Sequence, residues 1–422
     1  MVGMRRSLVT VVVAAVVAPL ALSACGDNNK RSASWVGAGA SGAPSVGPSG
    51  PAQGPVTEAG AVPISLSVTP AVGKKDVPVS AELGLKVSGG KVTTVTLTDG
   101  DGKAVPGKLR TDGSAWVPGK TLKTKETYAA SVVATSESGL TKTVTTKFTT
   151  MGAPGRKTGT GLYLFDDKTY GVAMPVVVEF SPGIKKADRA AVQKRMFVDT
   201  TPAQPGVWSW TSSGTQAYYR GPKFWAAGTT LAVRIAVGGL PTGGGRYGDR
   251  DRSATAKIGR SFEMKVDNAT KKMTVVENGK TVRTVPVSLG KASTPSSSGV
   301  MVVMDKMAQT VFDTRAELGP QEGYRIDIQY AQRLTWSGQY IHSAPWSVGS
   351  QGRRNVSHGC VNVSPANARW LFSKTLVGDP ITVKGTSDKL AYGNGWTAWN
   401  VSWAEFLKGS ALPVPESLKS LK

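Results

Sequence analysis

The chain has 422 residues, 40% of them hydrophobic, and a formal net charge of +23. This length exceeds what one hydrophobic core supports, so we expect two to four domains, and the hydrophobic content excludes a wholly disordered chain. Lysines and arginines are scattered through all segments, without a basic run or a basic helix. The charge therefore favours an anionic lipid or wall polymer as partner and argues against nucleic acid.

The first residues predict export. Arg5 and Arg6 precede an apolar stretch over residues 8–22, which is shorter than the about 20 apolar residues of a membrane span and is interrupted by Pro19. We predict a signal peptide over residues 1–24. Small residues directly before Cys25 resemble the lipobox of bacterial lipoproteins, which implies a lipidated Cys25 and anchoring to the outer face of the cytoplasmic membrane. An ordinary signal peptide with an incidental cysteine is the alternative.

The next segment, residues 25–62, is predicted to be a tether. After Cys25 it consists mostly of Gly, Ser, Ala and Pro, which cannot build a core. A tether of this composition would let the folded part stand away from the membrane and act in the cell wall space.

Two β-sandwich domains are predicted next, over residues 63–150 and 151–258. Short runs of alternating polar and apolar residues, separated by Gly and Asp turns, indicate antiparallel immunoglobulin-like sandwiches. Residues 187–196 suggest a short helical connection, and Gly243 to Gly245 a turn. No cluster of acids, His or Cys lies in the first domain, so we interpret it as a spacer.

Residues 259–385 predict another β-rich domain, which makes the chain mainly β. Asn278-Gly279 is a strong hairpin signal, and Ser364-Pro365 indicates the start of one helix. The segment 386–422 is interpreted as a short C-terminal subdomain. Its Trp396, Trp399 and Trp403 would share one face of a helix, as a packing stripe against the preceding domain or as a surface for carbohydrate.

Scarce residues gather in this third domain. The sequence has two histidines and two cysteines, and His342, His358 and Cys360 lie within 19 residues. If Cys25 is lipidated, Cys360 is the only thiol of the exported protein and has no disulfide partner. A thiol beside an imidazole is the minimal equipment of a nucleophilic cysteine, and His342 could take its proton if its strand runs beside the Cys360 loop.

The residues around this pair resemble a known family. His342-Ser343, followed by Ser357-His358-Gly359-Cys360-Val361-Asn362, is similar to the signature of the L,D-transpeptidases with a YkuD-like catalytic domain. The predicted order of lipobox, tether, two immunoglobulin-like domains, catalytic domain and Trp-bearing tail resembles the actinobacterial lipoprotein members.

The resemblance implies a reaction and a role for each residue. Cys360 would attack a peptidoglycan tetrapeptide stem between its third and fourth residues, and His342 would be the base, oriented by the backbone carbonyl of Ser343. The amides of His358, Gly359 and Cys360 would face the oxyanion. Tyr324 and Trp346 would line the donor groove. No cofactor is implied, and carbapenems would be covalent inhibitors.

Several alternatives stay open. His358 could shape the loop or bind substrate, Ser357 is predicted to bind substrate, and Asn362 could fix the loop through its side chain or touch substrate. Arg354 could meet a substrate carboxylate or lie at a solvated loop edge, and Tyr324 and Trp346 could be buried packing residues. Three other functions are alternatives to the transpeptidase. The protein could be an L,D-carboxypeptidase or a non-catalytic wall-binding scaffold. It could also bind zinc through His342, His358 and Cys360, although these residues do not have the usual spacing of zinc ligands.

Overall fold

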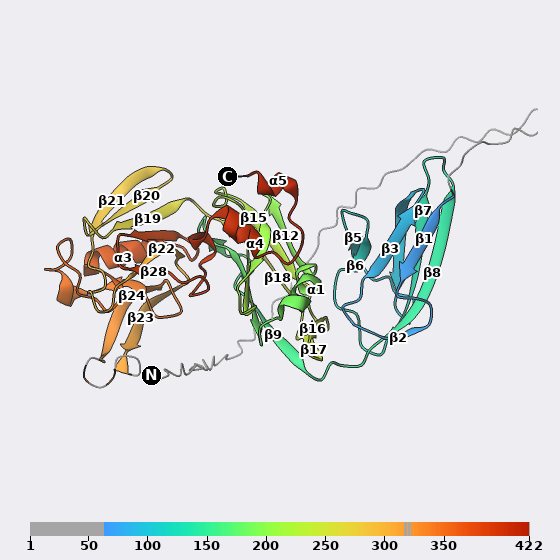
Figure 1. Cartoon of the computed structure of the whole chain (residues 1–422), viewed down its shortest axis with the longest axis horizontal. Coiled ribbons are helices and arrows are strands. Elements are labelled where there is room, and N and C mark those ends of the chain that lie inside the picture. Colours follow the sequence, from blue (N-terminus) through green and yellow to red (C-terminus); the bar gives the residue numbers. More distant parts are fainter. Residues whose placement is uncertain (1–62, 316–318, 320, 322, 422) are drawn as a thin grey trace, which may run out of the picture. The chain divides into compact units, whose positions relative to one another are not determined.

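The computed structural model describes residues 63–315, 319, 321 and 323–421. The predicted signal peptide, Cys25 and the tether up to residue 62 lie outside the described residues. The described part is built mainly of strands with a few short helices (Figure 1). None of its helices is long and apolar enough to cross a membrane.

The first domain is a sandwich of two four-stranded sheets, with the orders β1-β3-β6-β5 and β2-β8-β7-β4. Leu97, Val132 and Phe148 are buried in its core. The predicted immunoglobulin-like sandwich is present, although β2, β5 and β6 have only three or four residues, too few for alternation to reveal them. The strands are β1 (Ser65–Thr69), β2 (Lys74–Val77), β3 (Leu83–Ser88), β4 (Lys91–Thr98), β5 (Gly107–Leu109), β6 (Ala115–Pro118), β7 (Thr127–Thr135) and β8 (Thr141–Thr150).

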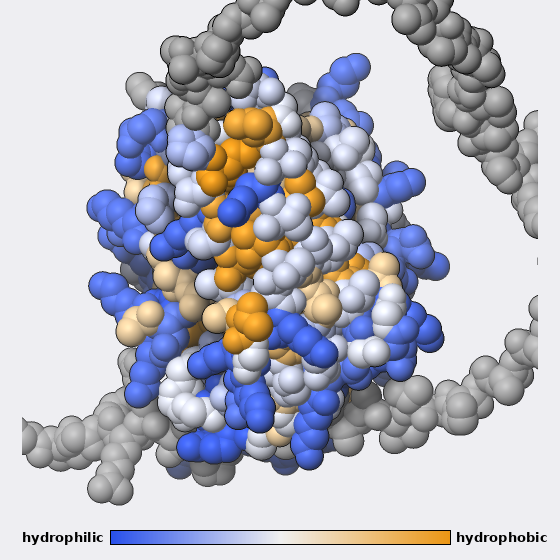
Figure 2. All heavy atoms as spheres, turned by 90° about the vertical axis from the view of Figure 1, so that its right-hand side faces the viewer, coloured by the Kyte–Doolittle hydropathy of each residue, from blue (hydrophilic) through white to orange (hydrophobic). Residues whose placement is uncertain are grey.

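The surface of this domain combines apolar and basic side chains. Figure 2 views the molecule from the right-hand side of Figure 1, where the first domain lies, and shows apolar atoms gathered at the centre with hydrophilic side chains around them. Val72 and Leu140, both in turns between strands, are among the exposed apolar residues of the domain.

The second domain is also a sandwich, formed by sheets of order β10-β18-β15-β12 and β13-β14-β11-β9-β17-β16. The predicted helical connection is confirmed as η1 and α1, and the predicted turn of three glycines joins β16 to β17. The elements are β9 (Lys157–Leu162), β10 (Thr169–Tyr170), β11 (Val176–Ser181), η1 (Lys186–Asp188), α1 (Arg189–Gln193), β12 (Met196–Thr201), β13 (Val207–Trp210), β14 (Gln216–Arg220), β15 (Thr230–Ile235), β16 (Pro241–Gly243), β17 (Arg246–Gly248) and β18 (Arg252–Ile258).

The third domain contains a six-stranded sheet of order β21-β20-β19-β27-β22-β28 and a four-stranded sheet of order β23-β24-β25-β26. Phe262, Ile341 and Leu371 lie in its core. Asn278 and Gly279 have φ values of 48° and 80°, as the predicted hairpin turn requires. The strands are β19 (Phe262–Asp267), β20 (Lys272–Glu277), β21 (Lys280–Pro286), β22 (Ser297–Val302), β23 (Asp305–Asp313), β24 (Arg325–Arg333), β25 (Tyr340–Ser343), β26 (Val361–Val363), β27 (Pro380–Lys384) and β28 (Asp388–Lys389).

Two helical segments frame the strand that follows the cysteine. The short helix η2 (Pro345–Ser347) comes directly after β25, and α3 (Pro365–Lys374) follows β26. The predicted N-cap is confirmed, because the Ser364 hydroxyl accepts a hydrogen bond from the Asn367 amide. Each segment thus follows the carboxyl end of one of the two parallel strands, β25, which carries the histidine, and β26, which follows the cysteine.

The C-terminal tail corrects one prediction. Trp396, Trp399 and Trp403 do not share one helix, because only Trp403 lies in α4 (Trp403–Lys408); Trp399 lies in the short η3 (Ala398–Asn400), and α5 (Glu416–Lys419) follows. The tail contacts the third domain, as predicted, through β28 beside β22 and through Asn400, which accepts from the Val300 amide, and it docks on the second domain as well. The Trp399 indole donates to the carbonyl of Ala173, and all three rings belong to, or pack against, the core of the second domain.

Candidate active site

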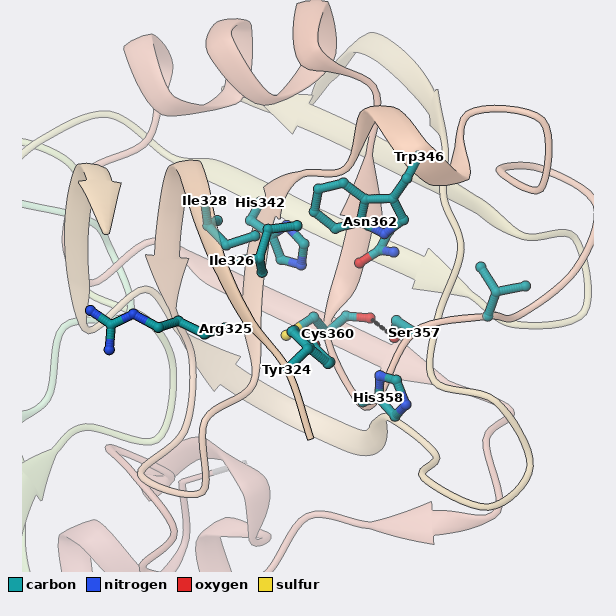
Figure 3. Close-up of a pocket in the computed structure, with 11 residues that line it drawn as sticks. Tyr324, Arg325, Ile326, Ile328, His342, Trp346, Ser357, His358, Cys360 and Asn362 are labelled. Atoms are coloured by element: carbon teal, nitrogen blue, oxygen red, sulfur yellow. Dashed lines mark hydrogen bonds between the residues drawn. The ribbon is translucent and has the colours of Figure 1, made fainter. Parts of the chain in front are cut away.

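Strands β25 and β26 bring the predicted base and nucleophile together. The strands are parallel, with His342 opposite Asn362, so Cys360 lies directly before β26 and beside the start of β25. Both His342 and Cys360 line one cavity of about 390 Å³ (Figure 3). The strand arrangement that the sequence required for this pair is therefore present.

The carbonyl of Ser343 orients the ring of His342. The Nδ1 atom lies 2.8 Å from that carbonyl oxygen, which can only accept a hydrogen bond, so Nδ1 carries the proton. Nε2 is then the unprotonated nitrogen of the neutral ring. Phe312 and Trp346 pack near the ring, with centroid distances of 5.4 and 6.0 Å. This arrangement leaves Nε2 as the atom able to take a proton.

Burial keeps both groups uncharged near neutral pH. It lowers the pKa of His342 to about 4, although the bond to Ser343 acts in the opposite direction. It raises the pKa of the Cys360 thiol to about 12, although a hydrogen bond with the backbone of Tyr340 acts to lower this pKa. The thiol contacts the carbonyl oxygen of Gly338 at 3.7 Å. A neutral thiol and a neutral imidazole require the proton to move as the sulfur attacks.

The motif turn is held by its first serine. The Ser357 hydroxyl donates to the Cys360 carbonyl at 2.7 Å and accepts from the Gly359 amide at 3.2 Å. The resemblance implies three backbone amides as donors to the oxyanion. One of them, the Gly359 amide, already donates its hydrogen bond to Ser357 within the turn. Gly359 has φ +123°, whereas a Cβ there would meet only Gln339 Cγ at 3.7 Å. Backbone conformation, and not lack of space, requires glycine.

A second serine, which the sequence did not single out, supports the same turn. Ser296 is buried; its hydroxyl donates to the Gly359 carbonyl at 2.8 Å and accepts from the Gly290 amide at 2.9 Å. It lies in a run of serines before β22, which by composition is typical of a loop. Nothing in that run distinguishes Ser296 before the fold is known.

Aromatic residues line the cavity as the resemblance implies. The ring of Tyr324 lies 5.4 Å from that of His358, and burial raises the pKa of Tyr324, with the nearby Cys360 adding to this. Trp346 is 55% exposed, so it is available to a ligand and is not a buried packing residue. Figure 3 shows His342, Trp346 and Asn362 on one side of Cys360 and His358 on the other.

Asn362 takes the loop-fixing position and also faces the cavity. Its backbone exchanges two hydrogen bonds with Ser288, and its Nδ2 donates to the Ser347 hydroxyl at 3.2 Å. The Oδ1 atom is buried and has no hydrogen-bond partner among the described residues. Asn362 therefore combines a structural contact with a free acceptor at the cavity wall.

Arg354 lies outside the cavity lining. Its Nε donates to the Ser350 hydroxyl at 3.1 Å, which fits the loop-edge alternative. The cavity is lined instead by residues that the sequence did not single out, namely Arg325, Ile326, Ile328 and Val356. The alternation of Tyr324, directly before β24, with Ile326 and Ile328 in β24 was the available signal, because residues two apart lie on one face of a strand.

The zinc alternative finds no support. In the stretch of chain that the structure covers, no group of three His, Cys, Asp or Glu side chains is placed to hold a metal ion.

Comparisons with known proteins agree with this geometry. Residues 261–383 match the L,D-transpeptidase catalytic domain, and residues 74–241 match a bacterial Ig domain. L,D-transpeptidase 2 of Mycobacterium tuberculosis (strain CDC 1551 / Oshkosh) is 32% identical over 343 residues, which are 80% of this chain and 83% of the relative. L,D-transpeptidase 5 of Mycobacterium tuberculosis (strain ATCC 25618 / H37Rv) is 33% identical over 83% of this chain and 78% of its own.

Among solved structures, the L,D-transpeptidase LdtMt1 in complex with imipenem is 35% identical, with a TM-score of 0.46, and covers 55% of this chain and 100% of its own. The two full-length relatives, however, span most of both chains and carry the assignment. The chain belongs to the L,D-transpeptidase family.

Proposed function

We propose that the protein is a peptidoglycan L,D-transpeptidase that forms 3-3 cross-links through a thioester on Cys360, with His342 as base. The observation that carries this proposal is the Nδ1 contact of His342 with the Ser343 carbonyl, which leaves Nε2 unprotonated in the cavity that Cys360 also lines. Membership of the family supports the transpeptidase reaction, and the resemblance of the motif supplies the substrate.

The first half-reaction begins with the neutral pair. Nε2 of His342 takes the thiol proton as the Cys360 sulfur bonds to the carbonyl carbon between the third and fourth residues of the donor stem. The carbon–nitrogen bond then breaks, and the imidazolium returns its proton to the departing amine of D-alanine. The products of this half-reaction are a thioester on Cys360, free D-alanine and a neutral His342.

The second half-reaction uses the same groups. The side-chain amine of a diaminopimelate on a neighbouring stem attacks the thioester and loses a proton to His342. The carbon–sulfur bond breaks, the thiolate is reprotonated, and an amide joins the third residues of two stems. Trp346, exposed beside His342, and Tyr324, packed against His358, are the side chains we assign to stem binding.

The proposed location follows from the N-terminal sequence. The lipobox-like residues before Cys25 and the tether to residue 62 support anchoring by lipid to the outer face of the cytoplasmic membrane. The site would then act in the cell wall space. Replacing Cys25 with Ser should release the protein from the membrane fraction while leaving the activity of Cys360 intact.

One incubation separates the candidate reactions. With a disaccharide tetrapeptide, we expect a cross-linked dimer; a tripeptide monomer alone would instead identify an L,D-carboxypeptidase, and no product would favour a wall-binding scaffold. Intact-mass spectrometry after exposure to imipenem should show a covalent adduct on the Cys25→Ser control and none on Cys360→Ala. An adduct on Cys360→Ala would refute the nucleophile assignment.

A further inference from the structure

The carbonyl that the thiol contacts belongs to a tight turn. Thr335 to Gly338 connect β24 to β25, and the Gly338 amide donates to the Thr335 carbonyl. Gly338 has φ +90°, a conformation that favours glycine. The Thr335 hydroxyl, which is fully buried, accepts from the Gln339 amide at 3.0 Å. We call residues 335–339 the 335–339 turn.

This turn reaches Cys360 from two directions. The Gly338 carbonyl oxygen lies 3.7 Å from the Cys360 sulfur. The side chain of Gln339 packs towards Gly359, and its amide exchanges two hydrogen bonds with Ser297, at 2.8 and 3.1 Å. The turn also leads directly into Tyr340, whose backbone faces the thiol. A shift of the turn would therefore displace the Gly338 carbonyl and the Tyr340 backbone, which both face the thiol. It would also displace the Gln339 side chain, which packs towards Gly359.

A residue of the C-terminal tail holds this turn. Asn394 accepts from the Ser337 amide through Oδ1 at 3.0 Å and donates from Nδ2 to the Ser337 hydroxyl at 2.9 Å. The pair of bonds fixes both the position and the orientation of Ser337. On the other side, Arg333 donates to the carbonyls of Thr335 and Trp336, both at 3.1 Å. Two partners from different segments thus clamp the turn.

The tail itself is fixed by the second domain. Tyr218 donates to the carbonyl of Gly395, the residue after Asn394, at 2.7 Å, and Trp396 is buried in the core of the second domain. Asn394 is therefore followed directly by residues that are anchored on the second domain. A contact chain runs from Tyr218 through Gly395, Asn394 and Ser337 to the carbonyl of Gly338.

We propose that Asn394 is a positioning residue for the reaction: by holding the 335–339 turn it keeps the Gly338 carbonyl and the Tyr340 backbone in place around the Cys360 sulfur. The proposal rests on the proposed role of Cys360 as nucleophile. According to this proposal, the C-terminal tail influences the reaction rate through Asn394, in addition to packing against the folded domains. Small displacements of a reacting group lower rates strongly, so the effect should appear in the chemical step.

The matched pair of variants is Asn394→Ala and Asn394→Asp. Alanine removes both contacts to Ser337. Aspartate keeps an acceptor for the Ser337 amide, and its second oxygen can accept from the Ser337 hydroxyl, which can also accept from the Thr335 hydroxyl 3.1 Å away. Both would be made in the full-length chain with Cys25→Ser, purified in detergent, so that Cys360 is the only thiol of the sequence. Thermal unfolding shows whether each variant is folded.

Imipenem acylation, followed by mass spectrometry over a range of concentrations, provides the test. We expect Asn394→Ala to lower the maximal acylation rate about tenfold with a half-saturating concentration that is unchanged, and Asn394→Asp to restore most of the rate. Equal maximal rates in Asn394→Ala and the parent, or an Asn394→Asp rate as low as that of alanine, would overturn the inference. A parent that forms no adduct would refute the proposed function instead.

Discussion

His342 donates from Nδ1 to the carbonyl oxygen of Ser343 at 2.8 Å, and among the residues that the structure describes no acidic side chain lines the cavity. A carboxylate in this place would stabilise the imidazolium, whereas a carbonyl fixes the tautomer and adds no full charge. Burial outweighs the opposite effect of this contact on the pKa, so the base stays neutral through most of the pH range. The nucleophile must then lose its proton during attack.

The pH dependence of acylation should report His342. Its pKa of about 4 means that the ring is protonated, and unable to accept a proton, only in acid. We expect the imipenem acylation rate to be level from about pH 5.5 to 7.5 and to fall as the pH drops through about 4. Stopped-flow or quenched mass measurements would show this. A fall centred near 6.5, the usual histidine value, would contradict the buried neutral base.

Replacing each histidine separates their roles. His342→Gln should lower acylation by about 10² to 10⁴, the usual contribution of a general base. His358→Gln is the matched control, because His358 is the other histidine of the sequence and lines the same cavity. We expect a smaller loss for it. Equal losses would leave the base assignment without support.

Ser357→Ala tests the motif turn. The hydroxyl joins the Gly359 amide to the Cys360 carbonyl, so its removal leaves both without that partner. We expect destabilisation of about 1 to 3 kcal/mol and a clear loss of acylation. Thermal unfolding and imipenem adduct formation measure the two effects. Ser373→Ala, an exposed position on α3, is the control and should change neither.

The nucleophile and base could be predicted from the sequence because they are chemically scarce. Two histidines and two cysteines in 422 residues leave few ways to pair a thiol with an imidazole. Strands were predicted where short runs of polar and apolar residues alternate between Gly and Asp turns. The hairpin at Asn278-Gly279 was found because its turn demands positive φ.

The supporting residues could not be predicted in the same way. Ser296, Gln339 and Asn394 act through hydrogen bonds to segments far along the chain, and their residue types are common in loops. The docking of Trp399 on the second domain likewise depends on tertiary contacts that spacing does not encode. The spacing of three and four residues predicted one helix for the three tryptophans. In the structure, Trp396 precedes η3, Trp399 lies in η3 and Trp403 lies in α4.

Arg220 should stabilise the docked tail. The guanidinium is 2% exposed and donates to the carbonyls of Ala398 and Val401, at 3.0 and 2.9 Å. It also lies over the rings of Trp399 and Phe406, at 4.6 and 4.2 Å. Burial lowers its pKa to about 10, which leaves it charged at neutral pH. The contact is thus a buried cation enclosed by aromatic rings and carbonyl oxygens.

Arg220→Met should therefore lower the free energy of unfolding by about 2 to 4 kcal/mol, since two buried carbonyls lose their donors and the cation–π contacts disappear. Thermal unfolding measures the change, and limited proteolysis should cut the tail sooner. Arg250→Met, at a side chain that is 73% exposed, is the control and should stay within about 0.5 kcal/mol. Similar melting temperatures for both variants would show that the tail does not depend on Arg220.

Asp379 should make stability depend on pH. Its carboxyl is fully buried, accepts from the Leu376 amide at 2.7 Å and lies 3.5 Å from Arg260. Burial raises its pKa to about 7. The hydrogen bond from Leu376 and the positive charges of Arg260 and Lys306 act in the opposite direction and lower the pKa in part. Arg260 also pairs with Glu277, so it is shared between two carboxylates. Burial outweighs these contacts and leaves the charged form of Asp379 less stable than in water.

The sign of the effect follows from linkage. The pKa of Asp379 in the folded protein lies above the unfolded value of 3.8. The stability that the protonated Asp379 contributes to the folded state is therefore fully present below about pH 3.8 and is lost as the pH rises through about 7. Asp379→Asn cannot ionise and keeps an acceptor for Leu376. Between pH 5.5 and 8, we expect the parent to lose about 1 to 3 kcal/mol relative to this variant in urea unfolding. Asp305→Asn, at an exposed position, controls for the loss of one carboxylate. Parallel stability curves for the parent and Asp379→Asn would mean that the carboxyl does not titrate in this range.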